Sequence, residues 1–393
     1  MPQIKPEVEA FARIKVIGIG GSGKNAVNHM INSKVKGVEF IAVNTDAQDL
    51  HNSLPSKKIH IGKNLTRGLG TGMNPDLGKR AAEETKEEIQ EALKGSDMVF
   101  IAYGAGGGTG SGSGPIISKV AKEMGILTVA VVTKPFFFEG IQRMKIAEQS
   151  LDELRKAVDA LIIIPNDRLL STISRETTAR QAFAMCDDIL KQAVEGISDL
   201  ITMPGIINTD FADIRAIMEN AGSALMGIGI AGGENRAIEA AKLAISSPLL
   251  ELSIAGAKGV LFSIAGGDDL TMFEIQDAAK LITESIDPNA KVIFGTVHDE
   301  RLKKNELKIT VIASGFSDVT NKKSLFQNIT GTKEEEKKSK IFGGLSSGAE
   351  KEIRVETQSS QPPVVEEKKN LKNDFDDDND WGAVPAFLRR QKK

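Results

Sequence analysis

The 393-residue chain is long enough for two ordinary domains, and 40% of its residues are hydrophobic, which suffices to build a core in each. Its 50 basic and 53 acidic residues nearly cancel, so the sequence shows no basic field of the kind that marks nucleic-acid-binding proteins. One cysteine, Cys186, excludes an internal disulfide, and no apolar run reaches the roughly 20 residues that span a bilayer. We expect a cytoplasmic globular protein that contacts membranes only indirectly.

Apolar strands alternate with helical segments up to residue 165. The expected strands are residues 12–20, 38–44, 97–104, 126–133 and 160–165, and the expected helices are residues 21–32, 76–95, 115–124 and 140–158. This alternation predicts an α/β fold with a Rossmann-like, mostly parallel sheet that helices cover on both faces. Ligands of such sheets bind beyond the carboxyl ends of the strands, where two glycine-rich loops fall.

The first of these loops, "GIGGSG", matches the dinucleotide fingerprint through Gly18, Gly20 and Gly23. Asp46 follows the next strand, where a ribose-binding acid is expected, so the loop taken alone favours NAD. The second glycine loop, residues 104–114, opens another helix and offers backbone N–H groups for a second anion site. Two phosphate-binding loops on one sheet favour a nucleoside triphosphate, although in the second loop no Gly-Lys-Ser/Thr follows at the spacing of a Walker A motif.

The pair Glu139 and Arg143 and the single residue Asp187 each allow a structural and a functional interpretation. Glu139 and Arg143 lie four apart near a helix start, which suits a simple ion pair or contacts to a ribose and a phosphate. The apolar spacing of residues 178–202 predicts a long buried helix, in which Cys186 is a small core residue. Asp187 interrupts that spacing, either as a solvated charge or as an acceptor for the two donors of a guanine edge.

The next part of the chain predicts a smaller α+β unit. Strands are expected at residues 259–267, 291–297 and 307–316, with a helix at 270–286. Before them, the segment "NTDFADIR" places Asp210 and Asp213 in the first turn of a helix, where carboxylates either cap the helix or perform catalysis. The four histidines show no metal-ligand spacing, so no metal site is expected in the protein itself.

The composition changes after residue 316. Residues 317–373 are rich in lysine, glutamate, serine and glutamine, which is typical of a disordered linker. Aromatic residues return in residues 374–393, between an acidic cluster and a basic end. This segment is interpreted as a docking peptide, with a solubilising terminus or direct binding of anionic lipid through "RRQKK" as alternatives.

Many motifs together resemble the tubulin/FtsZ family of GTPases. They include "GGSGKNAVNHMI", "AVNTDAQDL", "AGGGTGSG", "VAVVTKPFFFEG", "IPNDRLL", "MPGIINTDFADIR", "AISSPLLE" and the terminal "VPAFLRR". The resemblance covers about residues 11–316 and the last dozen. It implies a GTP-binding domain, residues 11–177, a central helix, residues 178–202, and a second domain, residues 203–316, between a flexible N-terminus, residues 1–10, and the linker and terminal peptide.

The resemblance also implies roles for single residues. Nucleotide binding is expected from Gly20, Gly21, Ser22, Gly23, Lys24, Asn25, Asn44, Gly104, Gly107, Gly108, Thr109, Gly110, Thr133, Glu139, Arg143, Asn166, Phe183 and Asp187. Asn208, Asp210 and Asp213 are expected to activate water in the site of the next subunit, with GTP as substrate and Mg²⁺ neutralising the phosphates. The implied function is a filament-forming GTPase of the bacterial division ring at midcell, tethered to membrane adaptors through residues 381–390.

The sequence departs from the family pattern at a few positions. Ser111 stands where a second threonine is commoner, Tyr103 and Ala105 stand where alanine and methionine are usual, and Lys24 stands where a small or neutral residue is frequent. In the terminal peptide, Ala383 occupies a place often held by aspartate. Backbone and hydroxyl chemistry survive these changes, so we expect nucleotide binding to be kept.

Overall fold

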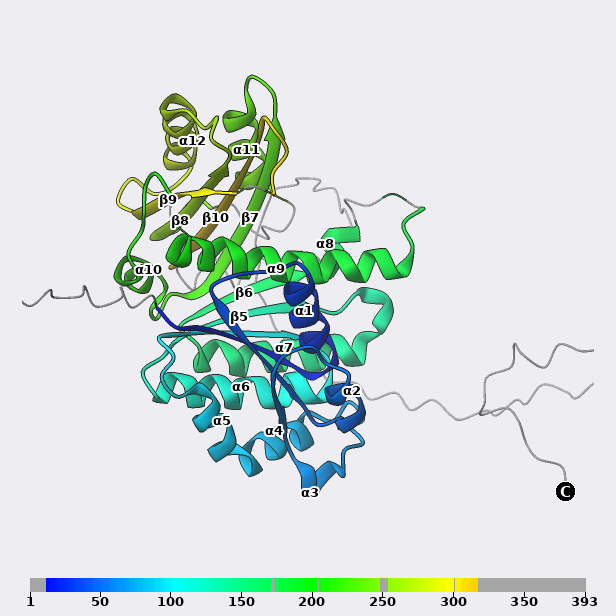
Figure 1. Ribbon diagram of the computed structural model, residues 1–393. Helices are drawn as coiled ribbons and strands as arrows, with labels where there is room; N and C mark the ends of the chain where they lie inside the picture. The colour runs from blue at the N-terminus through cyan, green and yellow to red at the C-terminus, as the bar shows by residue number, and fades with distance from the viewer. Residues whose placement is uncertain are drawn as a thin grey trace, which may run out of the picture. The chain divides into compact units, whose positions relative to one another are not determined.

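The computed structural model describes residues 12–170, 174, 176–203, 205–247, 254–299 and 301–316. The predicted N-terminal segment, linker and terminal peptide lie outside these residues. In the described part, residues 12–170 form a first lobe and residues 205–316 a second lobe, joined by one long helix (Figure 1). The domain boundaries predicted from the sequence stay a prediction, because a single sheet runs through both lobes.

The sheet contains ten strands in the order β3-β2-β1-β4-β5-β6-β7-β10-β8-β9. Their bounds are β1 Ile14–Ile19, β2 Val38–Asn44, β3 Lys57–His60, β4 Met98–Gly104, β5 Leu127–Lys134, β6 Ala160–Pro165, β7 Gly222–Gly232, β8 Gly259–Gly266, β9 Lys291–His298 and β10 Glu306–Ser314. Strands β1 to β6 pair in parallel, which confirms the Rossmann-like prediction. Strand β10 runs antiparallel to β7 and β8, so the second lobe has the mixed sheet of an α+β unit.

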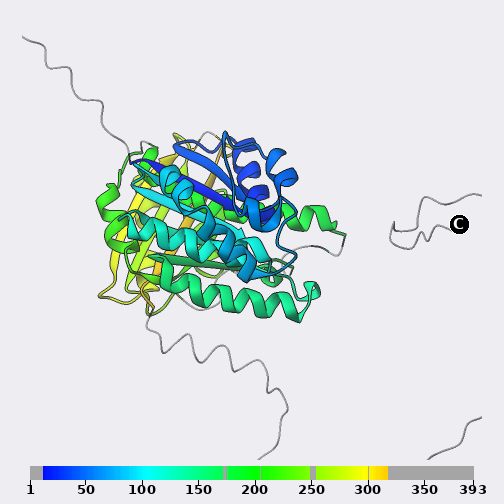
Figure 2. The ribbon, with the colours of Figure 1, turned by 90° about the horizontal axis from the view of Figure 1, so that it is seen from below.

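Helices cover both faces of the first lobe. Their bounds are α1 Gly20–Asn32, α2 Ala47–His51, α3 Lys63–Thr66, α4 Pro75–Glu84, α5 Lys86–Leu93, α6 Gly108–Glu123, the 3₁₀ turn η1 Phe137–Glu139, α7 Ile141–Ala157, α8 Asn166–Leu170, α9 Ala179–Thr202, α10 Phe211–Met218, α11 Arg236–Ile245 and α12 Met272–Glu284. One apolar core lies between the sheet and α1 and α9, and a second core lies under α4 to α7. Figure 2 looks onto this second layer.

Helix α9 connects the two lobes of the described chain and packs against both. Thr178 caps it through the Gln181 N–H, and its 24 residues give a length of about 36 Å at 1.5 Å per residue. Its buried face, which includes Leu190, Val194 and Ile197, packs in the same core as residues of both lobes. The two ends of α9 therefore mark two distant regions, with α8 near one end and α10 near the other (Figure 1).

Two predicted elements differ from the structure. The helix predicted at 76–95 is broken at Thr85, whose hydroxyl donates to the Ala81 carbonyl and accepts from Gly62 N–H. The helix predicted to begin at residue 115 begins at Gly108, because the glycine segment is itself helical. The second lobe also holds β7 and α11, which the sequence analysis missed. None of the described helices is long and apolar enough to cross a membrane.

Candidate active site

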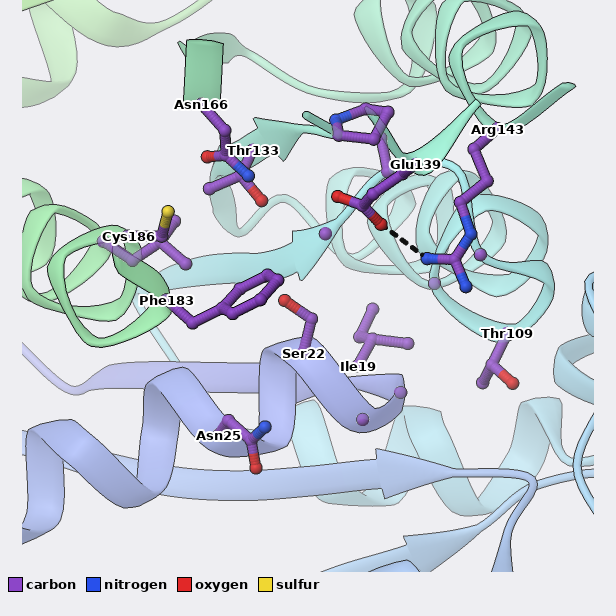
Figure 3. Close-up of a pocket in the computed structure, with 18 of the residues that line it drawn as sticks. Ile19, Ser22, Asn25, Thr109, Thr133, Glu139, Arg143, Asn166, Phe183 and Cys186 are labelled. Carbon is purple, nitrogen blue, oxygen red and sulfur yellow. Dashed lines mark hydrogen bonds and ion pairs between the residues drawn. The ribbon is translucent and has the colours of Figure 1, made fainter. Parts of the chain in front are cut away.

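A cavity of about 470 Å³ lies at the carboxyl ends of β1, β4, β5 and β6. The start of α1, the start of α6, the β5–α7 connection and the first half of α9 line it (Figure 3). Fifteen predicted nucleotide-binding residues meet here: Gly20, Gly21, Ser22, Asn25, Gly104, Gly107, Gly108, Thr109, Gly110, Thr133, Glu139, Arg143, Asn166, Phe183 and Asp187. The sequence analysis did not assign Ile19, Thr71, Ala105, Pro135, Cys186 and Leu190 to this cavity, although they also line it.

Two helix N-termini converge on the cavity. Helix α1 begins at Gly20, whose φ of +68° suits glycine, and α6 begins at Gly108 after the cap residue Gly107. Neither helix has a side-chain cap, so the first N–H groups of both are left for a ligand. A side chain at Gly20 would contact Gly110 N at 3.4 Å, which shows how closely the two loops approach. Paired helix N-termini of this kind suit a chain of phosphates.

Several glycines of the two loops serve packing instead of ligand binding. A Cβ on Gly23 would collide with the Ala102 carbonyl, so this glycine lets α1 lie directly on β4. A Cβ on Gly112 would collide with the backbone of Pro75 in α4. Gly23 was expected at the nucleotide, but the structure places it on the face of α1 that packs against β4, outside the cavity lining. Close helix packing therefore accounts for part of the glycine content.

Lys24 and Asn44 also lie outside the cavity lining, because both bind Asp49. The Lys24 ammonium is 2.5 Å from Asp49 Oδ1, and Asn44 Nδ2 donates to Asp49 Oδ2 at 2.8 Å. Asp46 accepts the Asp49 N–H at 2.9 Å and caps α2. The carboxylate expected at a ribose in an NAD site is thus a helix cap, which removes the main support for the dinucleotide alternative.

Hydroxyl groups line the phosphate side of the cavity. Thr109 Oγ1 is 2.7 Å from Thr45 Oγ1 and 3.3 Å from Thr71 Oγ1, so three threonines from separate loops meet at one point. Thr71 could not be found by local pattern, because it reaches the site from the connection before α4. Of the described residues that line the cavity, Arg143 is the only cation.

The opposite side of the cavity suits a nucleoside. Arg143 Nη1 donates to Glu139 Oε2 at 2.7 Å, and both side chains face the cavity (Figure 3). The ion pair and the ligand-facing position coexist, so the two interpretations made from the sequence do not exclude one another. Asn166 is buried, and its Oδ1 has no hydrogen-bond partner among the described residues. A buried acceptor of this kind is suited to a ligand hydroxyl. Phe183, 48% exposed, presents its ring to the cavity.

Asp187 lies deeper on α9 beside Cys186. Burial raises the pKa of the Asp187 carboxyl to about 6, and His29 opposes that rise. Burial and the charge of Asp187 raise the pKa of the Cys186 thiol to about 12, so the thiol stays neutral and donates to the Ala182 carbonyl. Cys186 is therefore a core residue as predicted, and Asp187 is a poorly solvated carboxylate at a cavity wall. A pair of donors such as guanine N1–H and its amino group would suit it.

The predicted catalytic residues lie far from this cavity. Asn208, Asp210 and Asp213 are exposed in and after the α9–α10 connection, at the other end of α9. Arg215 of α10 donates to the carbonyl of Gly125, just before β5, whereas the cavity lies beyond the far end of β5. The eight residues of β5 span about 26 Å, so the three side chains cannot reach the cavity of their own chain.

The Asp210 side chain makes no capping hydrogen bond to α10, although Asp210 is the N-cap residue. Among the described residues, neither Asp210 nor Asp213 has a side-chain hydrogen bond or an ion pair that explains its presence. Helix capping by these side chains, one of the alternatives left by the sequence, is therefore not what the structure shows for Asp210. Both carboxylates are thus exposed and have no side-chain partner within the part of the chain that the structure describes.

Comparison with known proteins identifies the family. Residues 13–174 match the model of the tubulin/FtsZ family GTPase domain, and residues 222–317 match that of the FtsZ family C-terminal domain. An FtsZ dimer structure from M. jannaschii is 44% identical, with a TM-score of 0.75 over 78% of this chain and 89% of that one. This chain belongs to the tubulin/FtsZ family. Its first lobe is a tubulin/FtsZ GTPase domain, and its activity is GTP hydrolysis.

More distant structures share the fold of this family member. GDP-bound CetZ1 of Haloferax volcanii is 22% identical, with a TM-score of 0.69 over 80% of this chain and 98% of that one. CetZ2 of the same organism, described as a GTPγS-bound protofilament, is 22% identical with a TM-score of 0.66 over 80% and 96%. These two structures show the shared fold alone. The family is shown by the FtsZ structure that is 44% identical.

Proposed function

We propose that GTP occupies the cavity at the sheet edge with its phosphates between the starts of α1 and α6. The uncapped helix N-termini supply the phosphate donors, and Glu139, Arg143 and Asn166 meet the sugar. Phe183 stacks against the base and Asp187 selects guanine. The orphaned Asn166 Oδ1 and the half-exposed Phe183 ring fit a ribose and a planar base, respectively.

We propose further that each site is completed by the next copy of the chain. The single observation that supports this is the separation of Asn208, Asp210 and Asp213 from the cavity by the lengths of α9 and β5. Carboxylates at the opposite edge meet a nucleotide only when copies stack head to tail. The carboxylates then orient and polarise the attacking water in the neighbour's site.

Exposed apolar side chains support this stacking. At the nucleotide edge Phe137, Phe138 and Ile141 are 72%, 60% and 89% exposed, and Leu69 of the loop before Thr71 is 85% exposed. At the opposite edge Ile206, Met272 and Phe273 are also largely exposed. Two apolar patches at opposite ends of one chain suit a heterologous interface that repeats into a filament. The relative solved as an FtsZ dimer is consistent with self-association.

Mg²⁺ fits the hydroxyl-rich phosphate side of the cavity. No cluster of three or more histidine, cysteine or acidic residues in the described ranges could hold a metal alone. The ion would therefore be held by phosphate oxygens, water and the hydroxyls around Thr109. When bound, it supplies the countercharge that Lys24, paired with Asp49, does not. EDTA is expected to stop turnover without unfolding the protein; unchanged turnover in EDTA would exclude this role.

The proposal predicts a steep dependence of specific GTPase activity on protein concentration. Below the concentration at which copies associate, sites lack their carboxylates and turnover is close to zero. Above it, activity per subunit rises to a plateau, measured by phosphate release alongside light scattering. Specific activity that is constant from the nanomolar range upward would show that one chain holds a complete site.

At the cellular level we propose a cytoplasmic filament that forms the ring at the division site. Residues 381–390, outside the described residues, would bind membrane-tethered adaptors as a short peptide, and direct contact of the basic end with anionic lipid is the second candidate. Deletion of residues 381–393 is expected to abolish adaptor pull-down. Co-sedimentation of the isolated peptide with anionic liposomes would favour the second candidate, and pull-down unaffected by the deletion would exclude the first.

A further inference from the structure

The first half of α6 contains a backbone defect next to the phosphate-binding residues. Pro115 lies inside α6 and has no N–H, so it cannot donate to the carbonyl of Ser111 four residues earlier. Residues 108–114, which carry the N–H groups that face the cavity, are therefore less firmly joined to the rest of the helix. Ser111 is buried, and its carbonyl would be a costly unpaired acceptor without another donor.

A side chain from α7 supplies the missing donor. Ser150 Oγ donates to the Ser111 carbonyl at 2.9 Å, and α7 runs beside α6 (Figure 1). The Ser111 hydroxyl in turn accepts the N–H of Gly106, at 2.9 Å, within the second glycine loop. One serine of α7 thus holds the segment that turns from β4 into the phosphate-binding end of α6.

Tyr103, the only tyrosine of the chain, sits behind this serine. Its hydroxyl is 3.1 Å from Ser150 Oγ and is fully buried. Ser150 has a single hydroxyl proton, which goes to the Ser111 carbonyl, so the Tyr103 hydroxyl must be the donor to Ser150. Burial raises the pKa of Tyr103, which keeps this proton in place at neutral pH.

The Tyr103 ring also explains two glycines of the second glycine loop. A Cβ on Gly110 would lie 2.9 Å from the ring, and one on Gly114 would lie 2.5 Å from it. These glycines are four apart and face the same side of α6, where they form the groove that receives the ring. The ring and the hydroxyl of Tyr103 therefore both act on residues 108–114.

We propose that Tyr103 and Ser150 are positioning residues for the phosphate-binding half of α6. They replace the helix hydrogen bond that Pro115 removes, and they hold the N–H groups of residues 108–110 in register with α7, the helix that carries Arg143. This proposal rests on GTP and GDP binding at the cavity. It adds two residues that do not line the cavity and that the sequence analysis left without a role.

The test measures GDP affinity of the full-length chain, since GDP binding does not require hydrolysis. Ser150→Ala and Tyr103→Phe are each expected to raise the Kd for GDP about fivefold, the value for one hydrogen bond. Their effects should not add in the double variant, because both act through the Ser111 carbonyl. Ser118→Ala is the matched control: Ser118 is buried in the same helix and has no hydrogen-bond partner among the described residues.

Rescue separates positioning from a general loss of stability. Pro115→Ala restores an N–H that donates to the Ser111 carbonyl, so Pro115→Ala/Ser150→Ala is expected to bind GDP within about twofold of the Pro115→Ala protein. Wild-type affinity in both Ser150→Ala and Tyr103→Phe, or a Pro115→Ala/Ser150→Ala protein that binds GDP as weakly as Ser150→Ala, would overturn the proposal. Tyr103→Phe keeps the ring and decides the matter if Ser150→Ala fails to fold. Failure of the wild type to bind GDP would instead refute the proposed function.

Discussion

If Asp187 binds guanine as proposed, its ionisation affects the affinity for the nucleotide. Its pKa is raised from about 3.8 to about 6 because the carboxyl is buried, so a sizeable fraction is protonated at pH 6. Guanine presents two donors, which favour the carboxylate. The Kd for GDP is therefore expected to rise as the pH falls from 7.5 through 6 to 5, and nucleotide binding should lower the pKa of Asp187. Equilibrium titration with a fluorescent GDP at each pH measures this.

Two variants show which residue causes the pH dependence of the Kd for GDP. Asp187→Asn cannot lose or gain a proton in this range, so its affinity should change little between pH 7.5 and 5. His29 lies nearby, with its Nε2 3.3 Å from Asp188 Oδ1, so His29→Gln tests whether the histidine is responsible instead. A steep pH dependence that persists in Asp187→Asn and disappears in His29→Gln would contradict the assignment.

At the scale of elements, a buried arginine joins the two helices of the second lobe. Arg236 begins α11 and is 4% exposed, and its guanidinium binds Glu274 in the first turn of α12 at 2.6 and 3.1 Å. The hydrogen bonds from Arg236 hold the pKa of Glu274 at about 2. A carboxyl with a lowered pKa stabilises the fold above its unfolded value near 4.5, and this stabilisation is lost as the pH falls from 4.5 towards 2.

Glu274→Gln is accordingly expected to lower the free energy of unfolding by about 2 kcal/mol at pH 7. The difference from wild type should shrink as the pH falls from 4.5 towards 2, the range over which Glu274 itself becomes protonated. Glu284→Gln is the matched control, since Glu284 lies on the same helix in a solvent-exposed pair with Lys280 at 4.0 Å. Equal destabilisation by the two substitutions in urea titrations would rule out the Arg236 contact as the cause.

Sequence patterns predicted the helices and strands that are marked by residues close together in the chain. The alternation of apolar strands and helices placed β1, β2, β4, β5, β6 and α9, because each of these strands and the buried helix face are marked by neighbouring residues, but it missed the short strand β3. The pattern failed for β7, α11 and the start of α6. Strand β7 contains several glycines, and Gly229 is needed because α11 packs directly on it, near Ala240 and Ala244. Such close packing is a property of two distant segments and leaves no periodic signal in either.

The site could be predicted in the same partial way. The glycine loops and Asn166 lie at strand ends, where position alone indicates ligand contact. The role of Lys24 could not be predicted, because it depends on Asp49, a partner 25 positions away. The approach of Thr71 to Thr109 and the repair of the Pro115 defect by Ser150 depend on contacts between different loops and helices. The sequence therefore predicts which single residues face the ligand, but it does not predict which distant residues contact one another.

At the scale of the whole molecule, the described chain has two different ends. The nucleotide cavity opens at one edge of the parallel strands, and Asp210 and Asp213 lie at the other. In the proposed function, these parts are the two incomplete halves of a hydrolytic site. Hydrolysis would then be a property of the contact between two copies, and GTP binding a property of one.

Complementation between two inactive variants tests this claim most directly. Asp213→Ala keeps the cavity and loses a carboxylate that we propose to be catalytic, whereas Gly107→Val keeps the carboxylates and places a side chain in the open space beside Gly107, where the phosphates are proposed to bind. Each variant alone is expected to show no turnover: Asp213→Ala binds GTP without hydrolysing it, and Gly107→Val does not bind GTP. An equimolar mixture is expected to recover at most about a quarter of the wild-type rate, because half the cavities are intact and half of those meet intact carboxylates. No recovery in a mixture shown to co-assemble, or full activity of Asp213→Ala alone, would contradict the account.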